Sequence, residues 1–270
     1  MNIRITSFFN QPSFVFFVLL IILSMPFYLL GAIAGLSSIS PLGLPLSALM
    51  FLCPMTLALM LTYRKDGRSG MKRLLKRIFD YRRIRMKGWY IPVVLLMPAV
   101  LMLSYLIMRL INLPLPVAKI SFLMIPVFFL VFSIGAIGEE LGWSAYLLEP
   151  LQERLGALKA SMLLGFVWAV WHIIPYHQMG HSLNWILWQC LATIGLRVIM
   201  VWIYNASGKS LFAVIVFHTM INVSEFIFPN YGSHYNPTIT GIIILCVAAI
   251  VSVILSREHF SSQPTRDSDI

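Results

Sequence analysis

The chain has 270 residues, of which 59% are hydrophobic and only 11% are charged, and its mean hydropathy is +0.84. Soluble globular proteins carry about 25% charged residues, so this composition excludes a water-soluble enzyme or binding domain. The 18 Phe, 10 Tyr and 7 Trp also exclude a disordered chain. The sequence therefore predicts an all-α, polytopic membrane protein.

The net charge of +10 comes largely from one segment. Eleven of the 20 basic residues lie between Arg64 and Lys87, where the only acidic residues are Asp66 and Asp80. In a membrane protein such a cluster is typical of a cytoplasmic loop beside anionic lipid. Nucleic-acid binding would instead require basic residues on a folded soluble element. We therefore expect the lipid bilayer, and no nucleic acid, as the partner of this segment.

A membrane-spanning helix needs about 20 mostly apolar residues, and about eight stretches meet that requirement. The fourth is too long for a perpendicular span, so we expect it to tilt, kink or extend past the bilayer surface. Residues 64–87 are expected to contain an amphipathic surface helix. The predicted spans are Phe14–Leu36, Pro41–Tyr63, Gly88–Ile111, Ile120–Leu148, Ala157–Pro175, Leu183–Tyr204, Ser210–Phe228 and Ile239–Leu255.

The basic residues also predict orientation, because cytoplasmic loops carry the excess of Lys and Arg. Placing loop 64–87 inside puts both termini in the cytoplasm, and Lys119 is then the only Lys or Arg in the opposite loops. We expect an integral protein of a bacterial plasma membrane. The predicted organisation is N-terminal helices at 1–119, a central region at 120–228, and a last helix with a polar tail at 229–270.

Two adjacent carboxylates interrupt the fourth apolar stretch. Glu139 and Glu140 follow a mostly apolar run that starts at Val127, and Trp143 and Tyr146 continue the apolar pattern after them. A charge at the centre of a membrane helix costs about 2.5–3.5 kcal/mol on insertion scales. The continuation argues against the simpler interpretation that the pair marks the end of the helix. We expect these carboxylates to be protonated, paired or facing a water-filled interior.

Two histidines and an asparagine lie in other apolar stretches. His172 and His218 are in the fifth and seventh stretches, and Asn222 follows His218 on the same helix face. A single buried histidine is usually a satisfied core residue, but this set favours one site. The helical rise places Glu140 and His218 about 12 Å from the inner helix ends and His172 about 22 Å. His172 is therefore predicted to lie more than one helical turn farther from the inner helix ends than Glu140 and His218.

These residue types suit hydrolysis of a peptide bond inside the membrane. A glutamate in a low-dielectric pocket can serve as the general base on a water. Neutral imidazoles can bind a divalent metal that activates the water, or can donate to a developing oxyanion. The residues leave two options open, namely catalysis without a metal or a divalent metal such as zinc held by His172, His218 and Glu140.

Three stretches resemble the signature motifs of the CPBP intramembrane proteases. This group, also called the Abi family, includes the type II CAAX prenyl endopeptidases and bacteriocin-processing or immunity-associated proteins. The matching stretches are Glu139–Leu148, Trp168–His172 and His218–Asn222, in family order. The resemblance implies an eight-helix membrane fold, an active site within the membrane and a catalytic core at 120–228.

The resemblance also implies roles for individual residues. Glu139 and Glu140 would be the carboxylates that activate a water, and His172 and His218 the catalytic histidines. Asn222 would be the oxyanion donor or a further polar ligand.

The sequence departs from the family pattern at two positions. Ser144 stands where the first motif commonly has an arginine that could orient a carboxylate. Arg154 or Arg197 could replace it in space, although Arg197 lies near a predicted span end and is expected to extend toward the headgroups. Trp168 stands where the family commonly has phenylalanine, which we interpret as a change of bulk only.

Two functions remain open at this point. The complete set of glutamates, histidines and Asn222 favours an intramembrane endopeptidase that acts on a membrane-associated peptide or protein. Ser144 favours a non-proteolytic membrane protein on the same scaffold, acting in bacteriocin immunity or as a binding partner. Glu225 is interpreted as a solvated residue near the outer end of its span, and His177 and His181 as loop residues rather than a metal pair.

Overall fold

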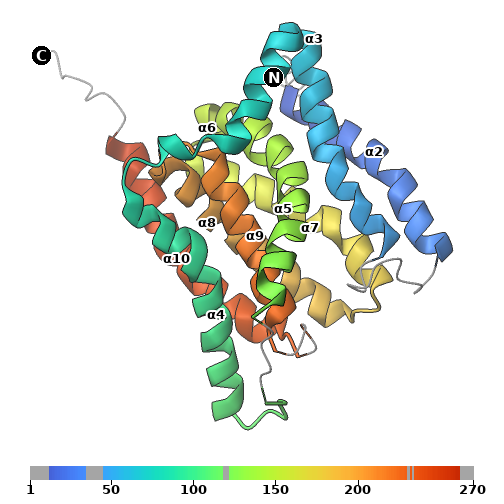
Figure 1. The fold of residues 1–270 in the computed structure, drawn as a ribbon, viewed down its shortest axis with the longest axis vertical. Helices are drawn as coiled ribbons and strands as arrows, with labels where there is room; N and C mark the ends of the chain where they lie inside the picture. Colours follow the sequence, from blue (N-terminus) through green and yellow to red (C-terminus); the bar gives the residue numbers. More distant parts are fainter. Residues whose placement is uncertain (1–11, 35–44, 118–121, 230–231, 233, 262–270) are drawn as a thin grey trace, which may run out of the picture.

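The computed structural model describes residues 12–34, 45–117, 122–229, 232 and 234–261. Every regular element in these residues is a helix. Within these residues, seven helices are long and apolar enough to cross a membrane, and α9 is apolar but shorter, with 17 residues. The prediction of a polytopic all-α membrane protein is confirmed, and α9 corresponds to the seventh predicted span (Figure 1).

The helix bounds agree with most of the predicted spans to within a few residues. The helices are α2 Pro12–Ala34, α3 Leu52–Lys76 after a 3₁₀ segment at Leu46–Phe51, α4 Tyr90–Leu110, α5 Met124–Gly142, α6 Leu148–Leu155, α7 Ala157–Gln178, α8 Leu183–Ala206, α9 Leu211–Ile227 and α10 Pro237–Ser261. Three predicted span ends, at Leu36, Pro41 and Ile120, lie outside the described residues, as does Lys119.

Helices α8 and α9 occupy the interior of the bundle. α8 packs against α7, α9 and α10, while α9 also packs against α4 and α5, and α5 packs against α3. Two thirds (67%) of the most apolar part of α8 is buried, a larger share than in any other described helix that is long enough to span a membrane. The start of α2, the end of α3 and the end of α10 lie at one end of the bundle (Figure 1).

The fourth predicted span changes helix type just after its acidic pair. α5 ends at Gly142, Trp143–Leu147 form a π-helical segment, and α6 continues to Leu155. π-Helical turns are rare and occur frequently at functional sites. The irregularity that was expected from the length of this span therefore lies beside the two glutamates.

Two glycines bring α5 close to α3 at the same level. A Cβ on Gly138 would lie 2.7 Å from the carbonyl oxygen of Phe51, and a Cβ on Gly142 would lie 2.5 Å from the Cβ of Pro54. Small residues four positions apart permit this close approach between membrane helices. The approach leaves Glu139 and Glu140 buried, with exposed fractions of 7% and 0%.

The basic segment continues α3 and then contacts the core. α3 breaks at Gly67, and its last residues to Lys76 form the helical part of the segment. Beyond it, Asp80 accepts hydrogen bonds from the Ser210 hydroxyl at 2.8 Å and from the backbone N–H groups of Leu211 and Phe212 at 3.2 and 3.0 Å. Asp80 therefore caps the N-terminus of α9, where a negative charge is favourable.

Candidate active site

Glu140 is the centre of a buried ion-pair network. Arg197 on α8 donates from Nη1 to its Oε2 at 2.9 Å and from Nη2 to its Oε1 at 3.1 Å. Nδ1 of His218 on α9 lies 2.9 Å from Oε1, and the Ser144 hydroxyl donates to Oε2. Both carboxylate oxygens are engaged, so this residue is held in place by three elements.

Glu139, the adjacent carboxylate, is engaged through one oxygen. The indole N–H of Trp168 on α7 donates to its Oε2 at 2.6 Å. No other hydrogen bond joins the Glu139 side chain to the described residues. The two neighbouring glutamates therefore differ, because Glu140 is fully occupied while Glu139 keeps Oε1 available to accept a proton from a water.

Trp168 connects all parts of this network. The guanidinium of Arg197 lies over its ring, 4.3 Å from the centroid. The rings of His172 and His218 stand edge-on to it at 5.6 and 5.3 Å. The interpretation of Trp168 as a change of bulk only is wrong, because phenylalanine has no N–H to donate to Glu139.

The two histidines lie at different levels of the site. Nδ1 of His218 faces Glu140, whereas Nδ1 of His172 lies 2.8 Å from the carbonyl oxygen of Trp168 on the preceding turn. His172 is stacked on Tyr176 at 5.6 Å. The offset given by the helical rise thus agrees with the structure, in which Glu140 pairs with His218. In both histidines Nε2 has no hydrogen bond to another described residue.

Asn222 lies one turn beyond His218 on α9 and is half-buried. Its amide makes no hydrogen bond with the described part of the chain. An asparagine amide carries two donors and an acceptor, so Asn222 keeps its full capacity to bind a polar group.

Arg197 occupies a different place from the one expected. Its side chain is 1% exposed and interacts with Glu140 in the centre of the protein, so the expectation that it extends to the headgroups is wrong. Its Nη1 lies 3.5 Å from the hydroxyl of Ser144, the residue at the family's arginine position. Arg197 thus places a guanidinium next to Glu140, although it comes from a different helix than the family's arginine position. An ionisable residue within an otherwise uncharged apolar run was the signal that could have found it.

The predicted metal ligands do not converge. Across the described ranges, no three His, Cys, Asp or Glu side chains gather in a group that could hold a metal ion. Both oxygens of Glu140 are also engaged by Arg197, His218 and Ser144. The residues therefore do not fit a metal site built on Glu140.

Glu225, for which the sequence predicts a solvated position near the outer end of its span, lies beside two other polar side chains. It is half-buried, and its Oε1 lies 3.3 Å from the hydroxyl of Tyr235. That hydroxyl also donates to Oε1 of Gln189 at 2.9 Å. In the loop between α7 and α8, His181 is stacked on Trp185 with ring centroids 3.6 Å apart.

Comparison with known proteins gives a family match and a curated relative. The family model of Rce1-like type II CAAX prenyl endopeptidases matches residues 121–224, a range that includes all three motifs. A curated relative, CAAX prenyl protease 2 of Methanococcus maripaludis, is 29% identical over 219 residues, which is 74% of this chain and 78% of the relative. The resemblance of the motifs is therefore confirmed, and the chain is similar to the type II CAAX prenyl endopeptidases.

Proposed function

We propose that the protein is an intramembrane endopeptidase that hydrolyses a peptide bond of a membrane-associated peptide or protein by means of a glutamate-activated water. The observation that carries this proposal is the asymmetry of the acidic pair. Glu140 is held by Arg197 and orients His218, while Glu139 keeps one free oxygen. A held carboxylate–histidine pair beside a free carboxylate supplies an oxyanion donor and a general base at one place.

The charges of the site support these roles. With His218 as an imidazolium, the two negative charges of the glutamates are balanced by two positive charges, on His218 and Arg197. An imidazolium donates from both nitrogens, so His218 can donate from Nδ1 to Glu140 and from Nε2 to an oxyanion.

The proposed reaction has two steps. In the first, Oε1 of Glu139 takes a proton from water while the water oxygen bonds to the scissile carbonyl carbon. The resulting oxyanion accepts hydrogen bonds from Nε2–H of His218 and the amide of Asn222. In the second, the proton passes from Glu139 to the leaving nitrogen as the C–N bond breaks. His172, which contacts the same indole ring as His218, is positioned to assist this transfer.

The proposed substrate class is broader than the prenylated substrate for which the relative is named. CAAX prenyl protease 2 is named for a prenylated substrate, and a prenylated C-terminal peptide is one candidate. A bacteriocin leader peptide suits the same catalytic residues and is a second candidate.

We also propose a bacterial plasma-membrane location with both termini in the cytoplasm. The start of α2 and the end of α10 lie at the same end of the bundle as the basic continuation of α3 (Figure 1). This arrangement supports the proposed orientation, because Lys and Arg are enriched in cytoplasmic loops.

The non-proteolytic alternative depended on Ser144 in place of the family arginine. The pairing of Arg197 with Glu140 removes that argument, because a guanidinium is present at the carboxylate.

The test is cleavage of a quenched membrane-peptide library by purified, detergent-solubilised protein. Wild-type cleavage should fall by about 10³-fold or more in Glu139→Gln and in His218→Ala, and should persist in Glu153→Gln, an exposed control on α6. Dialysis against EDTA should leave the rate unchanged. Full activity of Glu139→Gln would refute the assigned base, and a folded wild type that cleaves no library member would refute the proposed function.

A further inference from the structure

Polar and aromatic residues recur at one-turn intervals on α7, α8 and α9. The spacing of three or four residues puts each set on one face of its helix. α7 and α9 both pack against α8, which runs antiparallel to them. We define the polar column as Trp168, His172 and Tyr176 on α7, Arg197, Thr193 and Gln189 on α8, and His218, Asn222 and Glu225 on α9.

The proposed reaction uses residues in the inner part of the column. It gives no role to the polar residues in the outer part, such as Glu225. Glu225 lies two turns beyond His218, about 10 Å along the helix axis. An ionisable residue inside a membrane helix is costly and marks a functional site by default. In the described ranges Glu225 has no ion pair, and its Oε1 lies 3.3 Å from the hydroxyl of the uncharged Tyr235.

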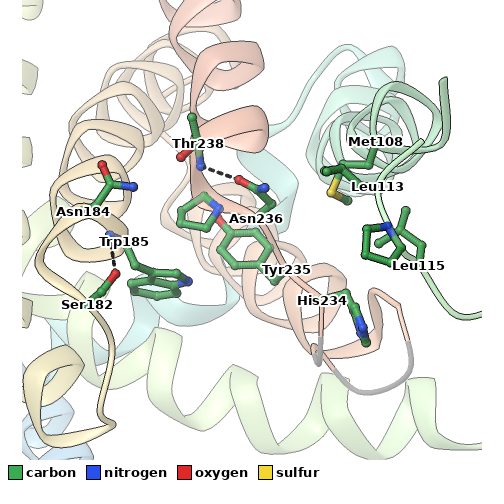
Figure 2. A pocket seen from close by; sticks show the side chains of 12 residues that line it. Met108, Leu113, Leu115, Ser182, Asn184, Trp185, His234, Tyr235, Asn236 and Thr238 are labelled. Carbon is green, nitrogen blue, oxygen red and sulfur yellow. Dashed lines mark hydrogen bonds between the residues drawn. The ribbon is translucent and has the colours of Figure 1, made fainter. Parts of the chain in front are cut away.

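The outer end of the column meets a pocket of about 350 Å³. The rings of Tyr235 and Trp185 line this pocket, and Figure 2 shows them next to each other, with centroids 6.2 Å apart. The hydroxyl of Tyr235 reaches Gln189 and Glu225 of the column. Trp185 also packs edge-on against Tyr176 at 5.3 Å. The same two side chains therefore border the pocket and the column.

The column has hydrogen-bonding groups that have no hydrogen bond to the described residues. At its inner end, Nε of Arg197 is buried and has no hydrogen-bond partner in the described part of the chain. On α9, one turn outward from His218, the amide of Asn222 has no hydrogen bond within the described residues. A buried polar group left unpaired costs about 1–3 kcal/mol, and ordered water is the usual partner of such groups. His172, Asn222, Tyr176 and Glu225 are half-buried, so each keeps some accessible surface.

We propose that the polar column is the path by which water reaches Glu139 from this pocket, with Glu225, Gln189 and Tyr235 at its mouth. The inference rests on the proposed function, because hydrolysis consumes one water for each bond broken. A column that only holds the helices together would exclude water and would leave these groups unpaired.

Thiol accessibility in proteoliposomes tests the path directly. The background carries Cys53→Ala, Cys190→Ala and Cys246→Ala, and Asn222→Cys adds one thiol in the column. The matched control is Ser224→Cys, two residues along α9 in an apolar groove lined by Met220 and Ile227. A charged, membrane-impermeant thiol reagent should modify Asn222→Cys about 100-fold faster, because water is needed to form and reach the thiolate. Equal rates would overturn the proposal.

A second pair of substitutions tests the mouth. Gln189→Leu with Glu225→Leu should slow the labelling of Asn222→Cys about tenfold, because both remove polar groups that retain water. Gln189→Asn with Glu225→Gln should restore most of the rate. If Gln189→Leu with Glu225→Leu leaves the labelling rate of Asn222→Cys unchanged, these two residues do not form the entrance of the water path.

Labelling does not require proteolysis. An inactive wild type that labels as expected would refute the proposed function and retain the water path. An active wild type whose column thiol stays unlabelled would refute the path alone.

Discussion

Arg197 and Glu140 form a two-point ion pair, with nitrogen–oxygen distances of 2.9 and 3.1 Å, although they are 57 residues apart on different helices. Such a pair fixes both distance and orientation, because the planar guanidinium matches the carboxylate at two points. The same carboxylate contacts His218. The geometry of the proposed oxyanion donor therefore depends on a residue outside the three family motifs.

Replacing Arg197 should damage both stability and activity. Arg197→Leu leaves Glu140 buried without its cation, and breaking a buried pair in this way costs about 3–5 kcal/mol. Arg197→Lys keeps a charge but loses the second contact, so it should lower activity with a smaller loss of stability. Thermal unfolding in detergent and peptide cleavage measure the two effects. If Arg197→Leu unfolds at the same temperature as the wild type, the ion pair does not stabilise the protein as described.

A relocated arginine should restore part of what Arg197→Leu loses. Ser144 already contacts Glu140 and occupies the family's arginine position. The double variant Ser144→Arg with Arg197→Leu should therefore unfold at a higher temperature than Arg197→Leu alone. Glu153→Arg with Arg197→Leu is the control, because it adds the same charge at an exposed position. Equal melting temperatures of the two double variants would show that Arg197 does not substitute for the family arginine.

Trp168→Phe isolates the indole N–H, because the ring that contacts both histidines is retained. Glu139 loses its hydrogen bond, and such bonds to a charged group contribute about 1.5–3 kcal/mol. We expect kcat to fall by roughly 10–100-fold, which is the same free energy expressed as a rate. Trp171→Phe is the control, since its indole N–H donates to Ser24 away from the glutamates. Equal effects on kcat of the two variants would refute a specific role for Trp168.

Sequence reasoning succeeded where periodicity and composition carry the information. The apolar runs predicted the helices, and the adjacent glutamates with His218 predicted a buried cluster. Contacts between distant helices were harder to predict, because the register of α8 against α5 decides whether Arg197 meets Glu140 or reaches the headgroups. The role of Trp168 depends in the same way on which atom of its ring faces Glu139. Neither relationship has a signature within one segment.

Arg77 should stabilise the protein far more than its neighbour Arg73. Arg77 donates to the carbonyl oxygen of Ala145 in the π-helical segment at 3.2 Å and to the hydroxyl of Tyr204 at 2.5 Å. Arg73 makes an exposed contact with Asp66 at 3.8 Å, and such pairs contribute about 0–1 kcal/mol. We expect Arg77→Ala to lower the melting temperature by several degrees and Arg73→Ala to leave it nearly unchanged. Similar melting temperatures of the two variants would contradict this role for Arg77.

Acidification should weaken the fold near the pocket through His181. Burial against Trp185 lowers the pKa of His181 below its ordinary value of about 6.5. The unfolded chain therefore binds a proton at a higher pH than the folded protein does. The contribution of His181 to stability is complete above about pH 6.5 and decreases as the pH falls through that value toward the folded-state pKa.

The measurement is the melting temperature of the wild type and of His181→Gln between pH 5 and pH 8. The wild type should lose more stability on acidification than His181→Gln, because the glutamine has no proton to gain. His177→Gln is the control, since His177 is an exposed histidine in the last turn of α7. That variant should keep the wild-type pH dependence. If His181→Gln also keeps it, the stacking of His181 on Trp185 does not control stability in acid.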